Sequence, residues 1–360
     1  MQSRQGAAQA ALQGLPLLII EAAILALHFT VTRGSAWHEP VLLLLAFPVL
    51  LATAGGVRAA APALVLPAVA LADDVANGGT AEIVFEMLFL LALTTTGFLI
   101  ARGVDVERAR NDRVLAATRE RTARLKDTSG LWQNVALTRM GAYTTSVEEA
   151  FLDEALRARP GGIVVDVGAA GGRLEHVLIR HADHVIATDL DRNEVYAMAD
   201  DSKLTPVVVG ELPVLPLRDD AVDTVVSIQA PAASDKAWFR EECRRVLRPG
   251  GAVLVTLYNA RSYKGLLTRI RRRFRRSGTP HWDDLYYQLS STEHLRLWRE
   301  AGFQPSRIRG YYWPPLSRQS ESTWVAAGSA IERLLGLRSL AGISPCVLVE
   351  LRRVDQTSQT

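Results

Sequence analysis

Hydrophobic positions divide this 360-residue chain into two parts with different patterns. Up to about residue 102, apolar residues form four long runs, at roughly 15–32, 38–54, 58–72 and 81–101. A helix that crosses a bilayer needs about 17–25 mostly apolar residues, and the first and last runs satisfy this requirement. The middle two runs are shorter and contain prolines, so they form either full spans or a re-entrant pair. The pattern predicts an α-helical transmembrane module of about four spans over residues 1–102.

Charged residues are distributed unevenly, and their positions predict an orientation for this module. The net charge of +3 combines an apolar part, with three basic residues in the first 100, and a highly charged remainder. In a four-span arrangement, Arg4, Arg58 and the basic cluster at 102–113 lie on one side of the membrane. The positive-inside rule places that side, and both ends of the module, in the cytoplasm. We therefore expect an integral membrane protein whose remaining domain is cytoplasmic.

Two carboxylates, Glu21 and Glu86, fall inside the first and last runs. Ionisable groups inside a bilayer are costly and are functional candidates, although a protonated Glu packed against a neighbouring helix is the alternative. The pattern over residues 38–102 resembles the four-span sensor modules of some bacterial membrane histidine kinases. This resemblance implies a sensing or dimerising role rather than a bare anchor, with a homodimer formed through the module as the dimerising form. We expect the membrane to be the bacterial inner (plasma) membrane.

Residues 103–130 are highly charged, with apolar residues interspersed. This composition is typical of a juxtamembrane helix or linker that leaves the bilayer. A solvated rigid spacer and a weak dimeric coiled coil are both consistent with it.

Residues 131–354 show apolar strand-like runs that alternate with amphipathic helical segments. Such alternation predicts an α/β, doubly wound, Rossmann-like domain with a mostly parallel sheet. The expected strands cover 162–167, 184–189, 205–209, 222–228 and 251–257. The expected helices cover 145–158, 173–181, 192–200 and 235–247. Residues 355–360 are expected to form a disordered tail.

A glycine-rich turn follows the first of these strands, in the sequence Val165-Asp-Val-Gly-Ala-Ala-Gly-Gly172. Such a turn lets the backbone approach a ligand closely at the carboxyl end of a strand. A dinucleotide-binding turn needs a third glycine where this chain has Arg173, which argues against NAD or FAD. The same residues resemble the first motif of the class I S-adenosylmethionine-dependent methyltransferases, with Ala170 in place of its central glycine.

Later segments continue this resemblance in order. Asp189 ends the second strand, where a carboxylate can accept both hydroxyl hydrogens of a ribose. The resemblance implies that Glu211 faces the adenine amino group and that the backbone N–H of Leu212 faces a ring nitrogen. Segments 241–251 and 295–303 match the family's later elements, with a capping box at Ser290 and Glu293. The resemblance implies seven strands, S-adenosyl-L-methionine as cofactor, and a cofactor site formed by Asp166, Gly168, Ala169, Ala170, Gly172, Asp189, Leu190, Glu211 and Leu212.

Composition and motifs limit the chemistry that this domain is expected to perform. Two cysteines, Cys243 and Cys346, are too few for a disulfide scaffold or a cysteine metal site, so no metal is expected. Methyl transfer is an in-line displacement that depends mainly on orientation, so no particular catalytic residue is implied. The segment 227–231 lacks the signature of enzymes that methylate nucleic-acid amino groups. Candidates for the acceptor pocket, each with a packing role as the alternative, are Gln229, Tyr258, Asn259, His281, Tyr286, Tyr287 and the run 311–315.

Residues 264–276 combine an apolar face with six arginines. A basic amphipathic helix of this kind is typical of contact with an anionic membrane surface, and nucleic acid or a plain solvated face are the alternatives. We expect membrane lipids as partners, no nucleic acid, and a small amphiphilic or lipid-linked methyl acceptor. A membrane sensor that binds S-adenosylmethionine without turnover and a protein methyltransferase remain alternative functions.

Overall fold

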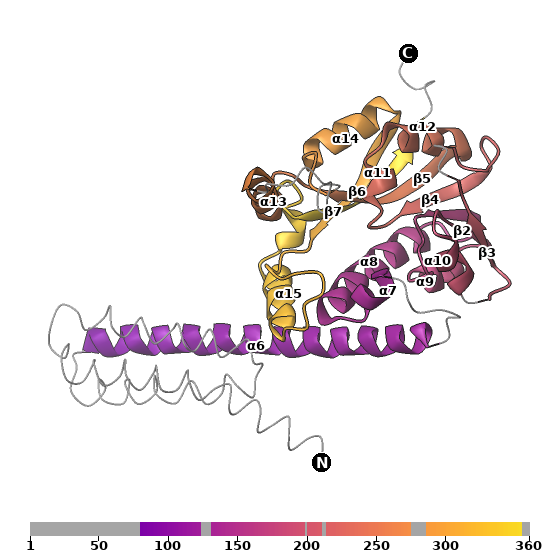
Figure 1. Ribbon diagram of the computed structural model, residues 1–360. Helices are drawn as coiled ribbons and strands as arrows, with labels where there is room; N and C mark the ends of the chain where they lie inside the picture. Colours follow the sequence, from indigo (N-terminus) through magenta and orange to yellow (C-terminus); the bar gives the residue numbers. More distant parts are fainter. Residues whose placement is uncertain (1–79, 124–130, 199, 211–213, 275–285, 355–360) are drawn as a thin grey trace. The chain divides into compact units, whose positions relative to one another are not determined.

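The computed structural model describes residues 80–123, 131–198, 200–210, 214–274 and 286–354 (Figure 1). The chain forms two compact units. One consists of Met1–Arg110 with Ser322–Leu334, and the other of Asn111–Glu321 with Leu335–Thr360. The first three apolar runs and the 355–360 tail lie outside the described residues, as do Glu211, Leu212 and His281.

In the first unit, the described residues belong to two helices, one of which continues past Arg110 into the second unit. Helix α6, Thr80–Thr122, extends through both the last apolar run and most of the charged segment that follows it. Helix α15, Trp324–Leu334, packs small side chains against Ile100 and Val104 of α6. The buried carboxylate of Glu107 accepts a hydrogen bond from Ser329 Oγ at 2.7 Å and pairs with Arg333. No helix in the part of the chain that the structure describes is long and apolar enough to cross a membrane.

A seven-stranded sheet is the centre of the second unit, in the order β3-β2-β1-β4-β5-β7-β6. Strand β7 is antiparallel to both of its neighbours, and the pairings from β3 to β5 are all parallel. This arrangement confirms the expected doubly wound, mostly parallel sheet. The strands are β1 Ile163–Val167, β2 His184–Asp189, β3 Leu204–Val208, β4 Val222–Ser227, β5 Leu247–Tyr258, β6 Phe303–Tyr311 and β7 Cys346–Arg353.

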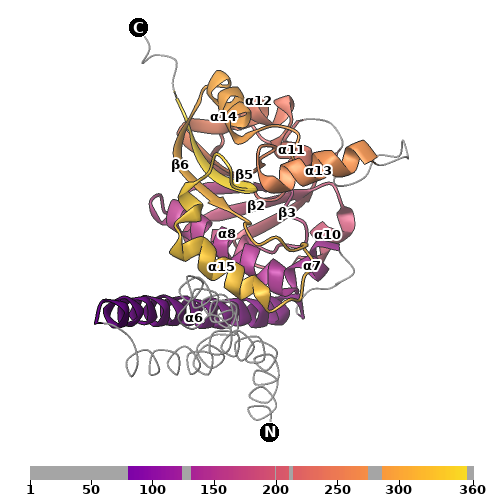
Figure 2. The same ribbon diagram turned by 90° about the vertical axis from the view of Figure 1, so that its left-hand side faces the viewer.

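Helices cover both faces of this sheet. Figures 1 and 2 show α12 and α14 over one face and α8 and α10 over the other. Phe239 and Cys243 of α12 and Trp298 of α14 join the valines of the central strands in one buried core. The helices of this unit are α7 Leu131–Ala136, α8 Arg139–Arg157, α9 Glu175–His181, α10 Arg192–Ala197, α11 Pro231–Ser234, α12 Ala237–Val246, α13 Tyr263–Phe274 and α14 Ser291–Glu300, with a 3₁₀ turn η4 at Leu337–Ser339.

Local capping explains where several helices begin. Asp191 caps α10, and the capping box of Ser290 and Glu293 at the start of α14 is present as expected. Helix α8 begins six residues earlier than expected, because Thr138 Oγ1 accepts a hydrogen bond from the N–H of Gly141 at 3.0 Å. Strand β5 also begins earlier than expected, at Leu247, with a bulge in its pairing with β4.

Candidate functional site

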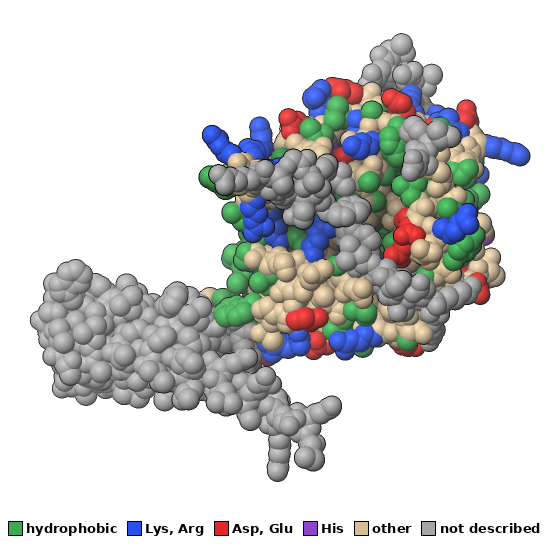
Figure 3. All heavy atoms as spheres, viewed as in Figure 1, with side chains coloured by type: hydrophobic (Ala, Val, Ile, Leu, Met, Phe, Trp, Pro, Cys, Tyr) green, Lys and Arg blue, Asp and Glu red, His purple; other side chains and the backbone are tan. Residues whose placement is uncertain are grey.

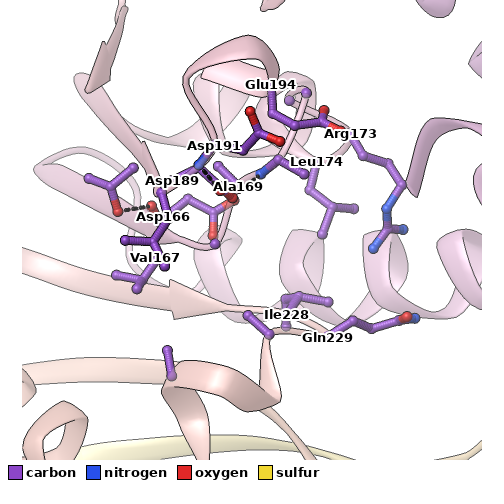
Figure 4. Close-up of a pocket in the computed structure, with 18 of the residues that line it drawn as sticks. Asp166, Val167, Ala169, Arg173, Leu174, Asp189, Asp191, Glu194, Ile228 and Gln229 are labelled. Atoms are coloured by element: carbon purple, nitrogen blue, oxygen red, sulfur yellow. Dashed lines mark hydrogen bonds between the residues drawn. The ribbon is translucent and has the colours of Figure 1, made fainter. Parts of the chain in front are cut away.

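A cavity of about 730 Å³ opens at the carboxyl ends of the parallel strands (Figure 4). Its lining comes from the turn after β1, the end of β2 and the residues that follow β4. The chain reverses its direction of travel through the sheet between β1 and β4, because β2 and β3 lie on one side of β1 and β4 lies on the other. Ligands of doubly wound sheets bind at such a switch point.

The turn after β1 has a backbone conformation that glycine favours. Gly168 and Gly172 have φ values of +82° and +80°, and Ala170 has a φ of +47°. A Cβ on Gly168 would lie 2.6 Å from the Cβ of Ala230, so this position has no room for a side chain. Ala170 occupies the position of the central glycine in the motif that the turn resembles. Its positive φ is the left-handed conformation that a glycine adopts easily and that is uncommon for a residue with a Cβ.

Asp189 connects the end of β2 to this turn. Its Oδ2 accepts a hydrogen bond from the N–H of Ala170 at 2.8 Å, and its Oδ1 accepts one from the N–H of Asp191 at 2.9 Å. Each carboxylate oxygen has two lone pairs, so both can accept a second hydrogen bond from a ligand hydroxyl. The side chain lies in the cavity lining, where a ribose would be bound.

Two carboxyl groups, Asp166 and Glu175, are buried together beneath the turn. Burial raises the pKa of Asp166 to about 7 and raises that of Glu175 well above its ordinary value, the negative charge of Asp166 adding to the effect. The guanidinium of Arg173 opposes both shifts. Two neighbouring buried carboxylates do not both ionise readily, so the pair retains a proton at neutral pH.

The chain was compared with known proteins. A family model described as a methyltransferase domain matches residues 165–255, which include the turn, Asp189 and β4. A probable S-adenosylmethionine-dependent methyltransferase of Mycobacterium tuberculosis is 29% identical over 181 residues, which cover 50% of this chain and 61% of that protein. The chain carries an S-adenosylmethionine-dependent methyltransferase domain.

Other relatives share smaller or more distant similarity. A malonyl-[acyl-carrier protein] O-methyltransferase of Coxiella burnetii is 36% identical over 104 residues, 29% of this chain and 36% of that protein. The chain thus spans less than two thirds of the length of these curated relatives. A geranyl diphosphate C-methyltransferase structure from Streptomyces coelicolor A3(2) aligns with a TM-score of 0.43 at 18% identity, covering 64% of this chain and 87% of that chain.

The cavity of the methyltransferase domain has suitable groups for S-adenosylmethionine. Asp189 offers acceptors for the ribose hydroxyls, and Leu190 and Ile228 offer apolar surface for the adenine ring. Acidic groups suit a sulfonium cation, and Asp166 lies in the lining with Asp189. The lining contains all the expected cofactor residues that the structure describes, which are Asp166, Gly168, Ala169, Ala170, Gly172, Asp189 and Leu190. Their individual roles remain predictions.

Sequence reasoning missed a charged network beside the cofactor turn. Glu148 of α8 is fully buried, and its Oε2 pairs with the guanidinium of Arg173 at 2.8 Å. Its Oε1 accepts hydrogen bonds from Gln229 Nε2 at 2.5 Å and from the Tyr311 hydroxyl at 2.7 Å. Gln229 has a φ of +57° and lies in the lining, and Figure 4 shows its side chain on the same side of the cavity as that of Arg173. The network therefore connects Arg173, at the end of the cofactor turn, to Gln229, which lies two residues after β4.

Other acceptor-pocket candidates have different roles. Asn259 is buried and braces loops, because it donates to the carbonyls of Gly342 and Ser344 and accepts from two backbone N–H groups. Tyr286 lies in the lining, and the Tyr258 ring packs edge-on against it. Tyr311 is buried in the Glu148 network rather than in the lining.

The end of α6 also contributes to the methyltransferase domain. Thr118 and Arg121 lie in the cavity lining, although the sequence suggested a solvated spacer or a weak coiled coil here. Arg121 pairs with Glu149 at 3.3 Å and contacts His176 Nε2 at 3.0 Å. These contacts hold this end of α6, which belongs to the second unit, against α8 and α9.

Proposed function

We propose that the protein is a membrane-anchored enzyme that transfers a methyl group from S-adenosylmethionine to a small amphiphilic or lipid-linked acceptor. The cofactor supplies a methyl group on a positively charged sulfur, so the acceptor's lone pair forms the new bond while the carbon–sulfur pair stays on sulfur. The protein's residues hold the reactants in line and exclude water. The transfer takes place at the cytoplasmic face of the inner membrane.

The observation that carries this proposal is the surface of α13. Leu266, Leu267, Ile270 and Phe274 are exposed, Phe274 at 79%, and they are interspersed with arginines. Figure 3 shows basic and hydrophobic side chains together at the edge of the domain where Figure 1 places α13. A helix with this surface suits the interface of an anionic bilayer, with its apolar side chains among the lipids.

Helix α13 is also connected directly to the cavity. Arg272 donates a hydrogen bond to the carbonyl of Tyr286 at 2.8 Å, and Tyr286 lies in the cavity lining. A bilayer in contact with α13 would therefore lie close to the acceptor side of the cavity. An amphiphilic acceptor could then reach the cavity while its apolar part stays in the membrane.

Membrane contact can be tested with the full-length protein in nanodiscs. Both native cysteines are buried, so a polarity-sensitive dye attached to Phe274→Cys reports on one position. We expect a blue shift in discs that contain phosphatidylglycerol. The matched control is Ile343→Cys, which carries the dye on an exposed apolar position outside α13. Equal spectra for the two positions would contradict membrane contact by α13.

Turnover separates the enzyme from a sensor that only binds the cofactor. Labelled S-adenosylmethionine is incubated with the protein and with lipid extracts of bacterial membranes, and the label in the lipid fraction is measured. We expect transfer to a lipid-soluble product. Binding of the cofactor without any transfer would favour the sensor.

A further inference from the structure

Two cationic side chains meet a group of tyrosines next to the cavity. The Lys264 Nζ lies 3.7 Å from the centre of the Tyr312 ring, and the Arg318 guanidinium lies 4.1 Å from the centre of the Tyr286 ring and 5.4 Å from that of Tyr258. The Tyr258 and Tyr286 rings pack edge-to-face at 4.7 Å. We call these five residues the tyrosine–cation cluster.

Strand order places this cluster on the acceptor side of the cavity. Asp189 and the cofactor turn follow β2 and β1, whereas Tyr258 is the last residue of β5. In the sheet, β4 separates β1 from β5, so the cluster lies at the same edge but beyond the cofactor residues. Tyr286 belongs both to the cluster and to the cavity lining, so the cluster adjoins the cavity at this residue.

Among the described residues, no carboxylate pairs with the ammonium of Lys264. Its ammonium donates to the carbonyl of Leu316 at 3.1 Å and lies over the Tyr312 ring. Burial lowers the pKa of Lys264 to about 7, and the positive charge of Arg318 contributes to this shift. A partly buried ammonium is therefore held close to a second cation, which an anion in the same place would stabilise.

The hydroxyl of Tyr258 provides a second, independent sign of a ligand. The side chain is 1% exposed, and its hydroxyl has no hydrogen-bond partner within the described part of the chain. A buried hydroxyl without a partner loses its hydration without compensation, so such a group in a native protein calls for a ligand or another partner. A phenol hydroxyl donates well to an oxyanion.

Backbone conformation around the cluster is also unusual. Tyr287 and Tyr312 have φ values of +59° and +74°, which residues with bulky side chains rarely adopt. Such conformations are unfavourable and concentrate at active sites and ligand-binding sites. The N–H of Tyr312 is held by the Tyr143 hydroxyl at 2.9 Å, so the core holds this conformation in place.

We infer that Lys264, Arg318 and the Tyr258 hydroxyl form a subsite for an oxyanion, a carboxylate or a phosphate ester, carried by the methyl acceptor. The subsite holds the anionic end of the acceptor while the tyrosine rings contact its apolar part. This inference rests on the proposed function, because it assigns the acceptor side of the same cavity. It narrows the acceptor class to anionic amphiphiles.

Matched amphiphiles test the subsite with the full-length protein in phosphatidylcholine nanodiscs saturated with S-adenosylhomocysteine. Octyl phosphate, octanoate, octanol and octyltrimethylammonium share one chain and differ in head group. We expect at least one anionic probe to bind about tenfold or more tightly than octanol, in line with a charged hydrogen bond. Equal binding of the anionic and neutral probes by the unmodified protein overturns the inference, whatever the variants do.

Variants then locate the binding. Lys264→Gln is expected to remove most of the preference for the anion, and Lys264→Arg to retain it. The control is Arg271→Gln, which changes an arginine of the same helix at an exposed position. A preference that survives Lys264→Gln, or one that Arg271→Gln removes equally, contradicts the assignment to the cluster.

Two further measurements distinguish a failure of the proposed function from a failure of the subsite, and a lipid from a non-lipid acceptor. Binding of S-adenosylhomocysteine is measured for each protein, and its absence in the unmodified protein contradicts the proposed function rather than the subsite alone. The probe titration is repeated in discs that contain phosphatidylglycerol. If this lipid competes with the probe, the oxyanion comes from a lipid head group. If it does not compete, the acceptor is not a lipid. Either result supports the subsite.

Discussion

The carboxylate of Asp189 accepts a hydrogen bond from the backbone N–H of Ala170 at 2.8 Å, which ties the end of β2 to the turn after β1. This bond holds the turn open toward the cavity and keeps the same carboxylate beside it. One side chain thus both shapes the cofactor turn and offers acceptors to a ligand.

Asp189→Ala is expected to weaken the binding of S-adenosylhomocysteine by about 1–3 kcal/mol, because it removes a charged acceptor. Isothermal titration calorimetry measures the change. The control is Asp201→Asn, whose carboxylate bonds the N–H of Lys203 outside the cavity lining. Unchanged affinity in Asp189→Ala would refute the ribose assignment.

The buried pair of Asp166 and Glu175 predicts a pH-dependent stability. Burial raises both pKa values, that of Asp166 from 3.8 to about 7, so the folded protein binds more protons than the unfolded chain in this range. The free energy of unfolding should therefore fall as the pH rises from about 4 to about 7. Glu175→Gln removes one of the two carboxyls and should lessen this fall.

We expect Glu175→Gln to be more stable than the unmodified protein at pH 8 by about 1–2 kcal/mol, with little difference at pH 4. Thermal unfolding across this pH range measures the effect. The surface variant Glu241→Gln on α12 serves as the control. If the stability of Glu175→Gln and that of the unmodified protein changed with pH in the same way, the two carboxyls would ionise freely and the prediction would be wrong.

Glu148→Gln is expected to destabilise the domain by about 3–5 kcal/mol, because it leaves the guanidinium of Arg173 without its buried carboxylate. Chemical denaturation measures the loss. Glu154 on the same helix forms a more exposed pair with Arg309 at 2.8 Å, so Glu154→Gln should cost less than about 1 kcal/mol. Similar losses in the two variants would contradict a special role for the Glu148 network.

The oxyanion subsite predicts a pH dependence for probe binding. Lys264 has a pKa lowered to about 7 by burial, with Arg318 lowering it further and Cys346 opposing the shift. Below this pH the ammonium is charged and attracts the anion, so octanoate, whose carboxylate is fully ionised in this range, should bind more weakly as the pH rises above about 7. The Cys346 thiol, whose pKa burial raises to about 12, stays neutral in this range. Lys264→Arg should remove the pH dependence while retaining binding.

Local signals in the sequence predicted much of this domain. The capping box of Ser290 and Glu293 depends on residues within three positions of each other, and the structure contains it. The five expected strands are present within a few residues, because alternating strand and helix patterns and glycine turns are encoded in short segments. Helix α15 was missed, since small residues such as Ala326 and Ala330 bury their surface only against another helix.

The roles of several polar residues could not be predicted from their local sequence. The sequence left Asn259 open between a pocket role and a packing role, and its amide donates to carbonyls more than 80 residues away. In the sequence, Arg173 served only to argue against a dinucleotide. Its partner Glu148 lies 25 residues upstream, on helix α8. Such pairings depend on how distant segments pack, and no periodicity or motif reports them.

By itself, the sequence determined the cofactor turn, the acid at the end of β2 and the succession of strands and helices along the chain. Turn conformation and strand patterning follow from neighbouring residues. Only the tertiary structure decided which side chains share the cavity. It brought Gln229 and Tyr311 to one carboxylate across 81 and 163 residues of chain, and it brought Lys264 and Arg318 into one group of tyrosines. The sheet does this because its parallel strands end at one edge, where segments far apart in the chain meet.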